Sequence, residues 1–308
     1  MMREPEKAVI TVPLPDDFDS FWAETLKSLP DPATSQTYVP ELSTDKVAVY
    51  DVHYTSYDNV RVAAWYATPR TGGPFPALVN IPGYISEPLP PVQWAERGYA
   101  ALAVAPRGKL RSNSHFNPGY PGLLTHNIVD HHTYGYRGFY VDVVRALDVL
   151  AERPEVDDGR IGLQGSSQGG GLGIVTAALR PDAVSCVAAG APYLCGIWDA
   201  AKLTHSYPYE EINEYLRLHP GHGELIRQSV AYYDGMNFAP KVRAPMFVYI
   251  GLEDDVCPPE TGYAVFNALD CPKELHTYPR CGHSAGLRWA MPKVAEFFDQ
   301  HLFPEGSR

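Results

Sequence analysis

The stretch Arg160-Ile-Gly-Leu-Gln-Gly-Ser-Ser-Gln-Gly169 joins a short apolar segment to a serine flanked by glycines. Residues 165–169 match the pattern Gly-x-Ser-x-Gly, directly after a strand predicted for Ile161–Gln164 and before a helix predicted to run through Leu179. Such glycines permit a sharp strand-to-helix turn that holds a serine hydroxyl clear of a sheet. The alternatives are a glycine-rich turn without chemistry and a phosphate-binding loop, which would need a following Gly-Lys-Ser/Thr. We therefore predict that Ser167 is a nucleophile.

Runs of apolar residues on both sides of this turn predict buried parallel strands. Each run is short and continuous, as in Pro76-Ala-Leu-Val-Asn-Ile-Pro-Gly83, which is typical of strands covered on both faces. Helical patterns lie between them, so we predict an α/β fold with a mostly parallel, doubly wound sheet in a single domain spanning 1–308. The other predicted strands are 99–106, 183–191, 245–251 and 274–279, and the other predicted helices are 141–152, 260–269 and 287–301.

Three further segments extend this core. An N-terminal helix is predicted over about residues 16–30, because apolar residues recur there at helical spacing after a possible aspartate cap. Residues 47–68 alternate in polarity and are interrupted by Asp58-Asn59, which predicts two antiparallel strands joined by a turn. Residues 193–239 are rich in Tyr, His and Pro and predict an insertion over the carboxyl edge of the sheet, where α/β proteins bind ligands.

A serine nucleophile needs a histidine base and a carboxylate that orients it, in the chain order Ser, Asp/Glu, His when the serine lies on this kind of turn. The predicted strand 245–251 is followed by Leu252-Glu-Asp-Asp255, and the next strand is followed by His283. His276 is a rival base, but it lies inside a strand pattern. The pattern alone leaves Asp254 and Asp255 as equal candidates for the acid.

The same chemistry needs backbone N–H groups that hold a developing oxyanion. One donor is expected from Gln168, the residue after the nucleophile. The second is expected from the loop after residues 76–81, where Pro82 has no N–H and leaves Gly83 or Tyr84; we favour Tyr84. Aromatic residues of the insertion, Tyr193 among them, either line a pocket or pack beneath the insertion.

Composition excludes several other functions. The net charge of -11 argues against a nucleic-acid partner, and no run approaches the roughly 20 apolar residues of a membrane span. The N-terminus lacks the apolar core of a signal peptide, and five cysteines without a Cys-x-x-Cys pair favour a reduced, cytoplasmic location. Asp130-His131-His132 and His219-Pro-Gly-His222 lack a third ligand at a recognisable spacing, so we expect no metal and no cofactor.

Motifs along nearly the whole chain resemble the carbohydrate esterase family of acetyl xylan esterases and cephalosporin-C deacetylases, which have the α/β-hydrolase fold. Many motifs in the same order make this resemblance more specific than Gly-x-Ser-x-Gly alone. The motifs are Phe18-Asp-Ser-Phe-Trp-Ala-Glu-Thr-Leu26, Pro82-Gly-Tyr84, Arg107-Gly108, Tyr136-Arg137, Asp142-Val-Val-Arg-Ala146, Val156-Asp-Asp-Gly-Arg-Ile161, Ser167-Gln-Gly-Gly-Gly171, Pro208-Tyr-Glu-Glu-Ile212, Tyr233-Asp-Gly-Met-Asn-Phe238 and Gly251-Leu-Glu-Asp-Asp-Val-Cys-Pro-Pro259.

The resemblance implies a serine esterase that removes acetyl groups from small carbohydrates and from cephalosporin C, and that assembles as a hexamer. It supports the catalytic residues Ser167, Asp254 and His283, choosing Asp254 because the family's acid lies three residues before the Cys of Cys-Pro-Pro. It also supports Tyr84 and Gln168 as oxyanion donors. Arg107 of the Arg-Gly motif and Tyr193 of the aromatic cluster are candidate substrate contacts. A serine peptidase or longer-chain carboxylesterase of the same fold, and a non-catalytic binding protein, are the alternatives.

Two positions depart from the family's motifs. Its Arg-Gly-Gln reads Arg107-Gly108-Lys109 here, and its His-Glu pair reads His283-Ser284. Neither change removes a predicted catalytic residue, so hydrolysis remains the expected reaction. Both changes lie close to the predicted site, so substrate range and assembly are where this chain is expected to differ.

Overall fold

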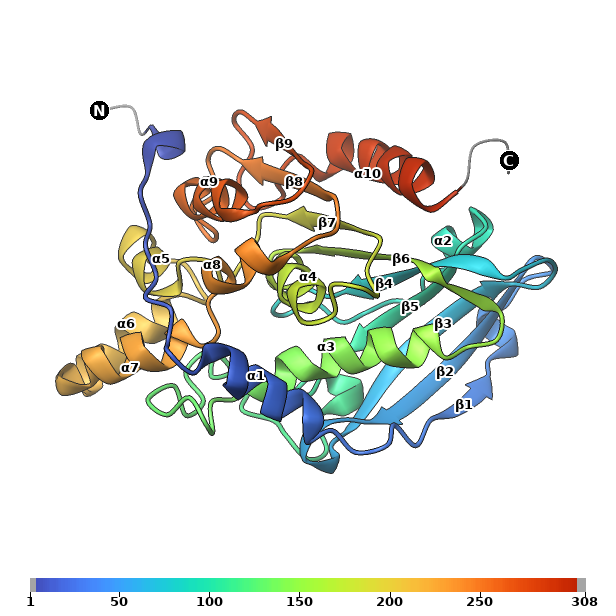
Figure 1. Cartoon of the computed structure of the whole chain (residues 1–308), viewed down its shortest axis with the longest axis horizontal. Coiled ribbons are helices and arrows are strands. Elements are labelled where there is room, and N and C mark those ends of the chain that lie inside the picture. The colour runs from blue at the N-terminus through green and yellow to red at the C-terminus, as the bar shows by residue number, and fades with distance from the viewer. Residues whose placement is uncertain (1–3, 304–308) are drawn as a thin grey trace.

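A computed structural model describes residues 4–303 and contains one nine-stranded sheet (Figure 1). The strand order is β1-β2-β3-β5-β4-β6-β7-β8-β9. All strands from β5 to β9 in that order are parallel, whereas β1 pairs antiparallel with β2, β2 with β3, and β3 with β5. The strands are β1 Ser35–Tyr38, β2 Val47–Thr55, β3 Arg61–Pro69, β4 Phe75–Ile81, β5 Ala100–Ala105, β6 Val156–Ser166, β7 Cys186–Gly190, β8 Met246–Gly251 and β9 Lys273–Tyr278. The predicted mostly parallel sheet with antiparallel N-terminal strands is confirmed.

Helices cover both faces of the sheet. α3 (Tyr136–Ala151) and α4 (Gln168–Leu179) lie on one face, and α2 (Val92–Glu96) and α10 (Leu287–Leu302) lie on the other (Figure 1). Every residue of β5 and of β8 is buried, as continuous apolar strands between two helical layers require. α9 (Pro259–Ala268) connects β8 to β9. Among residues 4–303, none of the helices combines the length and the apolar character that crossing a membrane requires.

The N-terminal helix α1 (Phe18–Lys27) buries the apolar face that its sequence predicts. Phe18, Phe21 and Trp22 are buried, and α1 lies beside α3 (Figure 1). The indole Nε1 of Trp22 donates a 2.9 Å hydrogen bond to the carbonyl oxygen of Tyr232, far along the chain. This contact ties the N-terminal segment to the insertion.

The segment between β7 and β8 folds into four α-helices and two short 3-10 helices at the carboxyl ends of the parallel strands (Figure 1). The α-helices are α5 (Ile197–Leu203), α6 (Glu210–Leu218), α7 (Gly223–Ala231) and α8 (Gly235–Phe238). Asp234 caps α8 through Met236 and also accepts hydrogen bonds of 2.8 and 2.7 Å from the amides of Gly196 and Ile197. Burial raises the pKa of Asp234 to about 6, against the lowering effect of these amides. The buried carboxylate thus holds α5 and α8 together.

Candidate active site

Ser167 occupies a strained turn between β6 and α4. Its φ of 59° and ψ of -122° lie in a region that residues with a Cβ rarely adopt. The turn is held by a 2.8 Å hydrogen bond from the Ser167 amide to the Gly190 carbonyl. A Cβ at Gly165 would lie 2.4 Å from the carbonyl carbon of Gly169, and a Cβ at Gly169 would lie 2.2 Å from the Ile81 oxygen. The flanking glycines are therefore required by close backbone approach, as the motif predicts.

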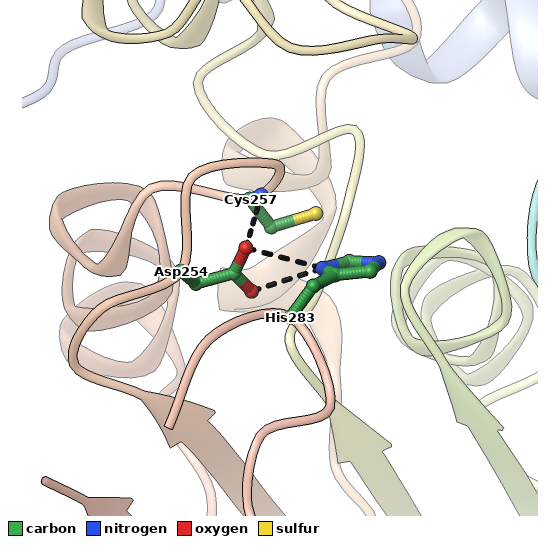
Figure 2. A group of neighbouring side chains, drawn as sticks. All are labelled: Asp254, Cys257 and His283. Atoms are coloured by element: carbon green, nitrogen blue, oxygen red, sulfur yellow. Dashed lines mark hydrogen bonds and ion pairs between the residues drawn. The ribbon is translucent and has the colours of Figure 1, made fainter. Parts of the chain in front are cut away.

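Asp254 and His283 meet at the carboxyl edge of the sheet, although they lie in the loops after different strands. The His283 Nδ1 lies 3.0 Å from Asp254 Oδ2 and 3.2 Å from Oδ1 (Figure 2). Asp254 Oδ1 also accepts hydrogen bonds of 2.8 and 2.9 Å from the amides of Val256 and Cys257. The Asp254 side chain is 1% exposed, whereas that of His283 is 32% exposed. A buried, oriented carboxylate thus holds one ring nitrogen while the imidazole stays accessible.

Cys257 completes this corner of the site. Possible ligand atoms of Asp254, Cys257 and His283 lie within 4.8 Å of one another, the one such trio among residues 4–303 (Figure 2). Burial, followed by the nearby Asp254, raises the pKa of the Cys257 thiol well above its usual value, while a contact with Ser167 lowers it. The thiol therefore stays protonated at neutral pH, and Asp254 already bonds directly to His283. We interpret the trio as an acid–base pair with a packed thiol beside it.

A cavity of about 630 Å³ opens at Ser167 and His283. It is large enough for a small substrate. Its wall includes the Ser284 that departs from the family motif, and Glu87 is the carboxylate residue in that wall. The remaining lining residues are Asn80, Ile81, Pro82, Gly83, Ser86, Pro88, Leu89, Pro90, Pro91, Gln93, Ala103, Gln164, Gly165, Ser166 and Leu287.

Two backbone amides are available to stabilise an oxyanion. The Gln168 amide begins α4, and the Tyr84 amide lies in the loop after β4, beside the cavity residue Gly83. Within residues 4–303 neither amide donates to another protein group. The side chains are occupied elsewhere: Gln168 Nε2 donates to the Tyr136 hydroxyl at 2.8 Å, and the Tyr84 hydroxyl donates to Glu211 Oε1 at 2.5 Å. The first turn of a helix favours negative charge, which suits Gln168 for this role.

Glu211 is a buried residue that sequence reasoning did not single out. Besides Tyr84, it accepts a 2.9 Å hydrogen bond from the Gly122 amide, and the Leu124 amide donates to the Tyr84 hydroxyl at 3.0 Å. Burial raises the pKa of Glu211, against the lowering effect of its donors. Glu211 therefore links α6 of the insertion to the loop after β4. Its place in the Pro208–Ile212 motif was the available signal.

Lys109, which stands where the resembling family has glutamine, is fully buried. Its Nζ donates hydrogen bonds to the carbonyl oxygens of Gly83, at 2.8 Å, and of Tyr84. The ammonium also lies 5.0 Å from the centre of the Tyr120 ring. Burial lowers the pKa of Lys109 to about 8, partly offset by the charge of Glu87.

Arg107 and Tyr193 are buried and are not among the residues that line the cavity, although the Tyr193 amide donates a 3.0 Å hydrogen bond to the Ser167 carbonyl, so a substrate contact by either residue stays a prediction. Arg107 is 4% exposed and binds Asp142 through both Nε and Nη2, each at 2.9 Å. Tyr193 is fully buried. The centre of its ring lies 4.6 Å from that of the Tyr209 ring and 6.0 Å from that of the Tyr84 ring. We interpret Arg107 as a structural cross-link and Tyr193 as packing beneath the insertion.

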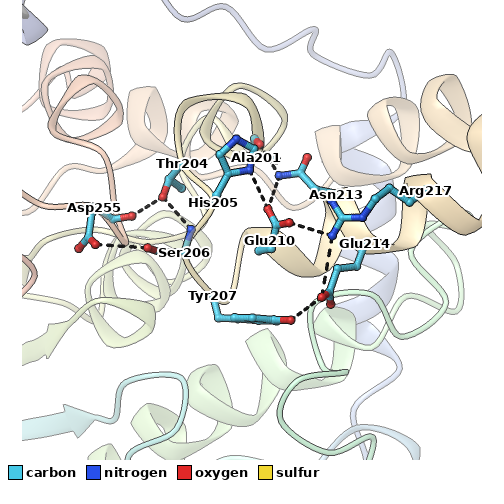
Figure 3. Close-up of polar contacts among 10 residues, drawn as sticks. All are labelled: Ala201, Thr204, His205, Ser206, Tyr207, Glu210, Asn213, Glu214, Arg217 and Asp255. Carbon is cyan, nitrogen blue, oxygen red and sulfur yellow. Dashed lines mark hydrogen bonds and ion pairs between the residues drawn. The ribbon is translucent and has the colours of Figure 1, made fainter.

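The rival residues lie in other surroundings. Asp255 faces the segment between α5 and α6: its carbonyl accepts from Thr204 Oγ1, and its Oδ2 accepts a 3.3 Å hydrogen bond from Ser206 (Figure 3). His276 lies in β9, where it stacks on Phe247 at 4.3 Å and contacts a neighbouring glutamate. Asp255 thus anchors the insertion. We interpret His276 as a residue that packs in β9 and not as a base.

Beyond Asp255, the insertion is cross-linked by Glu210 (Figure 3). Its carboxylate accepts from Asn213 at 2.8 Å and from Arg217 at 2.9 Å, and lies 3.0 Å from the His205 Nδ1. The hydrogen bond from Asn213, followed by those from Arg217 and His205, lowers the pKa of Glu210 to about 2. This network keeps the first turns of α6 in place over the sheet edge.

Comparison with known proteins points to one family. The family model described as acetyl xylan esterase (AXE1) matches residues 8–301. The acetyl esterase Axe7A of Xylanibacter ruminicola is 29% identical over 287 residues, which cover 84% of this chain and 61% of that protein. This chain thus spans about three fifths of the length of that relative.

Solved structures agree in fold over almost the full chain. An acetyl xylan esterase from Paenibacillus sp. R4 superposes with a TM-score of 0.90 and 32% identity, covering 98% of this chain and 100% of that one. Acetyl xylan esterase 1 from Thermoanaerobacterium sp. JW/SL YS485 also has a TM-score of 0.90, with 27% identity and 99% coverage of both chains. The α/β hydrolase GrgF from Penicillium sp. sh18, at 18% identity and a TM-score of 0.60, shares the fold. The chain therefore has the α/β-hydrolase fold.

Proposed function

Because the chain belongs to the acetyl xylan esterase (AXE1) family, we propose that it is a serine esterase that hydrolyses acetyl esters of small carbohydrates. The proposed substrates include acetylated xylo-oligosaccharides and, by family resemblance, cephalosporin C. The cavity of about 630 Å³ at Ser167 suits small molecules. The observation that carries the proposal is the Asp254–His283 pair at 3.0 Å, whose imidazole opens onto the same cavity as the strained Ser167.

In this mechanism the Ser167 hydroxyl attacks the acetyl carbonyl while His283 removes its proton. Asp254 accepts a hydrogen bond from the His283 Nδ1, which leaves the other ring nitrogen to act as base, and then stabilises the imidazolium cation. The oxyanion forms against the amides of Tyr84 and Gln168. His283 returns its proton to the departing sugar alcohol, and the acetyl group remains on Ser167.

Deacylation repeats these steps with water. His283 removes a proton from the water as it attacks the acetyl-serine, and the second oxyanion forms in the same place. As this intermediate collapses, the bond to the Ser167 oxygen breaks, His283 returns its proton to that oxygen, and acetate leaves. Every step uses side chains and amides of this chain.

The test compares chromogenic acetate, butyrate and octanoate esters, followed by acetylated xylo-oligosaccharides, with Ser167→Ala as the control variant. A steep preference for acetate that disappears in the variant is expected. Preference for the longer acyl chains would retain the nucleophile but overturn the acetyl assignment. Near-normal turnover by Ser167→Ala would overturn the serine mechanism itself.

The proposal extends to the oligomeric state of the protein and to its place in the cell. By family resemblance we propose a homo-oligomer, with a hexamer as the expected state, and light scattering of the purified chain measures it directly. We propose a cytoplasmic location because all five cysteines lack a disulfide, as a reducing compartment would leave them. A purified protein that remains monomeric at micromolar concentration would refute the oligomer.

A further inference from the structure

Lys109 and the loop after β4 meet because β4 and β5 are adjacent parallel strands. The loops that follow parallel neighbours emerge at the same edge of a sheet. Lys109 follows β5 by a few residues, and its Nζ reaches back to the carbonyl oxygens of Gly83 and Tyr84. A fully buried lysine is rare and needs such partners. The ammonium thus holds two consecutive carbonyl groups beside the cavity.

The hydrogen bond to Gly83 controls the direction of the Tyr84 amide. The carbonyl of Gly83 and the N–H of Tyr84 belong to one peptide unit, which is planar and trans, so the two groups point in opposite directions. Anchoring the Gly83 oxygen on Lys109 therefore turns the Tyr84 N–H away from Lys109. A hydrogen bond accepted from a cation also polarises the peptide, which makes its N–H a stronger donor.

The charged and titratable groups near Lys109 are few, and its ammonium bonds to the carbonyl oxygens of Gly83 and Tyr84. The carboxylate that affects the pKa of Lys109 is that of Glu87, whose Oε1 accepts a 3.0 Å hydrogen bond from the Leu110 amide. The ammonium lies 5.0 Å from the centre of the Tyr120 ring, and Glu211 accepts a hydrogen bond from the Tyr84 hydroxyl. With its pKa lowered to about 8, Lys109 is charged at neutral pH and loses its proton as the pH rises through that value.

We propose that Lys109 is a positioning residue of the oxyanion hole, whose ammonium holds the Gly83–Tyr84 peptide so that the Tyr84 N–H faces the reacting carbonyl. The inference rests on the proposed function, since it takes Tyr84 as an oxyanion donor. It gives a role to the lysine that replaces the glutamine of the resembling motif. A glutamine amide can donate the same two hydrogen bonds but carries no charge.

The experiment measures kcat and KM for a chromogenic acetate between pH 6 and 9.5 in four proteins: the parent, Lys109→Met, Lys109→Gln and the exposed control Lys27→Gln. Deleting an oxyanion donor typically costs 10²- to 10³-fold in kcat, so a misdirected donor in Lys109→Met is expected to cost about tenfold or more, with KM nearly unchanged. Lys109→Gln is expected to retain most of kcat. A neutral amine retains two N–H donors, so above about pH 8 the kcat of the parent should fall no lower than that of Lys109→Gln, and the Lys27→Gln control should match the parent.

A second readout separates positioning from general packing. Methyl trifluoromethyl ketone, which mimics an acetyl group, forms an oxyanion adduct with a serine nucleophile. Its affinity should therefore fall in Lys109→Met in parallel with kcat. The inference is overturned if Lys109→Met keeps kcat and ketone affinity within twofold of the parent. If that variant does not fold, a loss of tenfold or more in both kcat and ketone affinity in Lys109→Gln overturns it. Activity in Ser167→Ala would instead refute the proposed function, so the two failures are distinguishable.

Discussion

Replacing Arg107 by methionine separates a structural role from a substrate contact. In the parent, Arg107 and Asp142 form an ion pair at 2.9 Å with side chains 5% and 0% exposed, and Arg107 Nη2 also donates to the Tyr57 carbonyl at 2.8 Å. The Arg107→Met variant keeps the hydrogen bond from the residue's own amide to Asp142, at 2.8 Å, but leaves a buried carboxylate without its countercharge.

Removing one partner of a buried pair costs about 3–5 kcal/mol, since the other charge stays buried and unpaired. With an unfolding entropy of about 2.1 cal/mol/K per residue, this loss lowers the melting temperature of the 308-residue chain by about 5–8 °C. Arg243→Met is the matched control, because Arg243 and Asp182 are also 2.9 Å apart but are 71% and 88% exposed. That exposed pair should contribute less than about 1 kcal/mol.

Thermal unfolding and ester kinetics are measured on the same preparations. We expect Arg107→Met to be destabilised while KM stays within about twofold of the parent, and Arg107→Met combined with Asp142→Leu to recover part of the loss, since an apolar pair avoids the unpaired charge. A variant of parental stability whose KM rises tenfold would refute the structural interpretation and restore Arg107 as a substrate contact.

Asp254→Asn should lower kcat by about 10³- to 10⁴-fold with little change in KM, whereas Asp255→Asn should stay within threefold; equal losses in steady-state kinetics would contradict the assignment. Iodoacetamide at pH 7 should leave Cys257 unmodified in the folded protein, since its pKa is raised; mass spectrometry that finds rapid alkylation would oppose this. Glu210, with its pKa lowered to about 2, stabilises the folded chain above its unfolded pKa near 4.5 and loses this contribution as the pH falls from there toward 2, so Glu210→Gln should flatten the fall in melting temperature between pH 5 and 3. A fall in melting temperature that is as steep in Glu210→Gln as in the parent would contradict this role of Glu210.

The sheet was predictable because its strands carry strong local patterns. The buried runs of β4, β5, β7 and β8 and the alternation of β2 and β3 each follow from periodicity and turn residues. β1 was missed because all four of its residues are exposed, so it has no apolar pattern. α2 has five residues and follows a proline-rich loop, which leaves too short a pattern to detect.

The candidate site was predictable where chain order and strand ends determine it. Ser167 follows one strand and His283 follows another, so both reach the same edge. Side-chain surroundings were not predictable in the same way. A lysine is ordinarily exposed, and only the fold brings the carbonyls that allow Lys109 to be buried. Arg107 can be buried because it pairs with Asp142, which lies 35 residues further along the chain, on α3.

The central claim is that an acetyl group passes through Ser167. The most direct measurement is mass spectrometry of the protein quenched in acid during turnover of a chromogenic acetate, with proteolysis to locate any added acetyl group. We predict one acetyl group on the peptide that contains Ser167, and none in Ser167→Ala. Turnover that continues in Ser167→Ala, or acetylation at a different residue that turns over at the rate of catalysis, would contradict it.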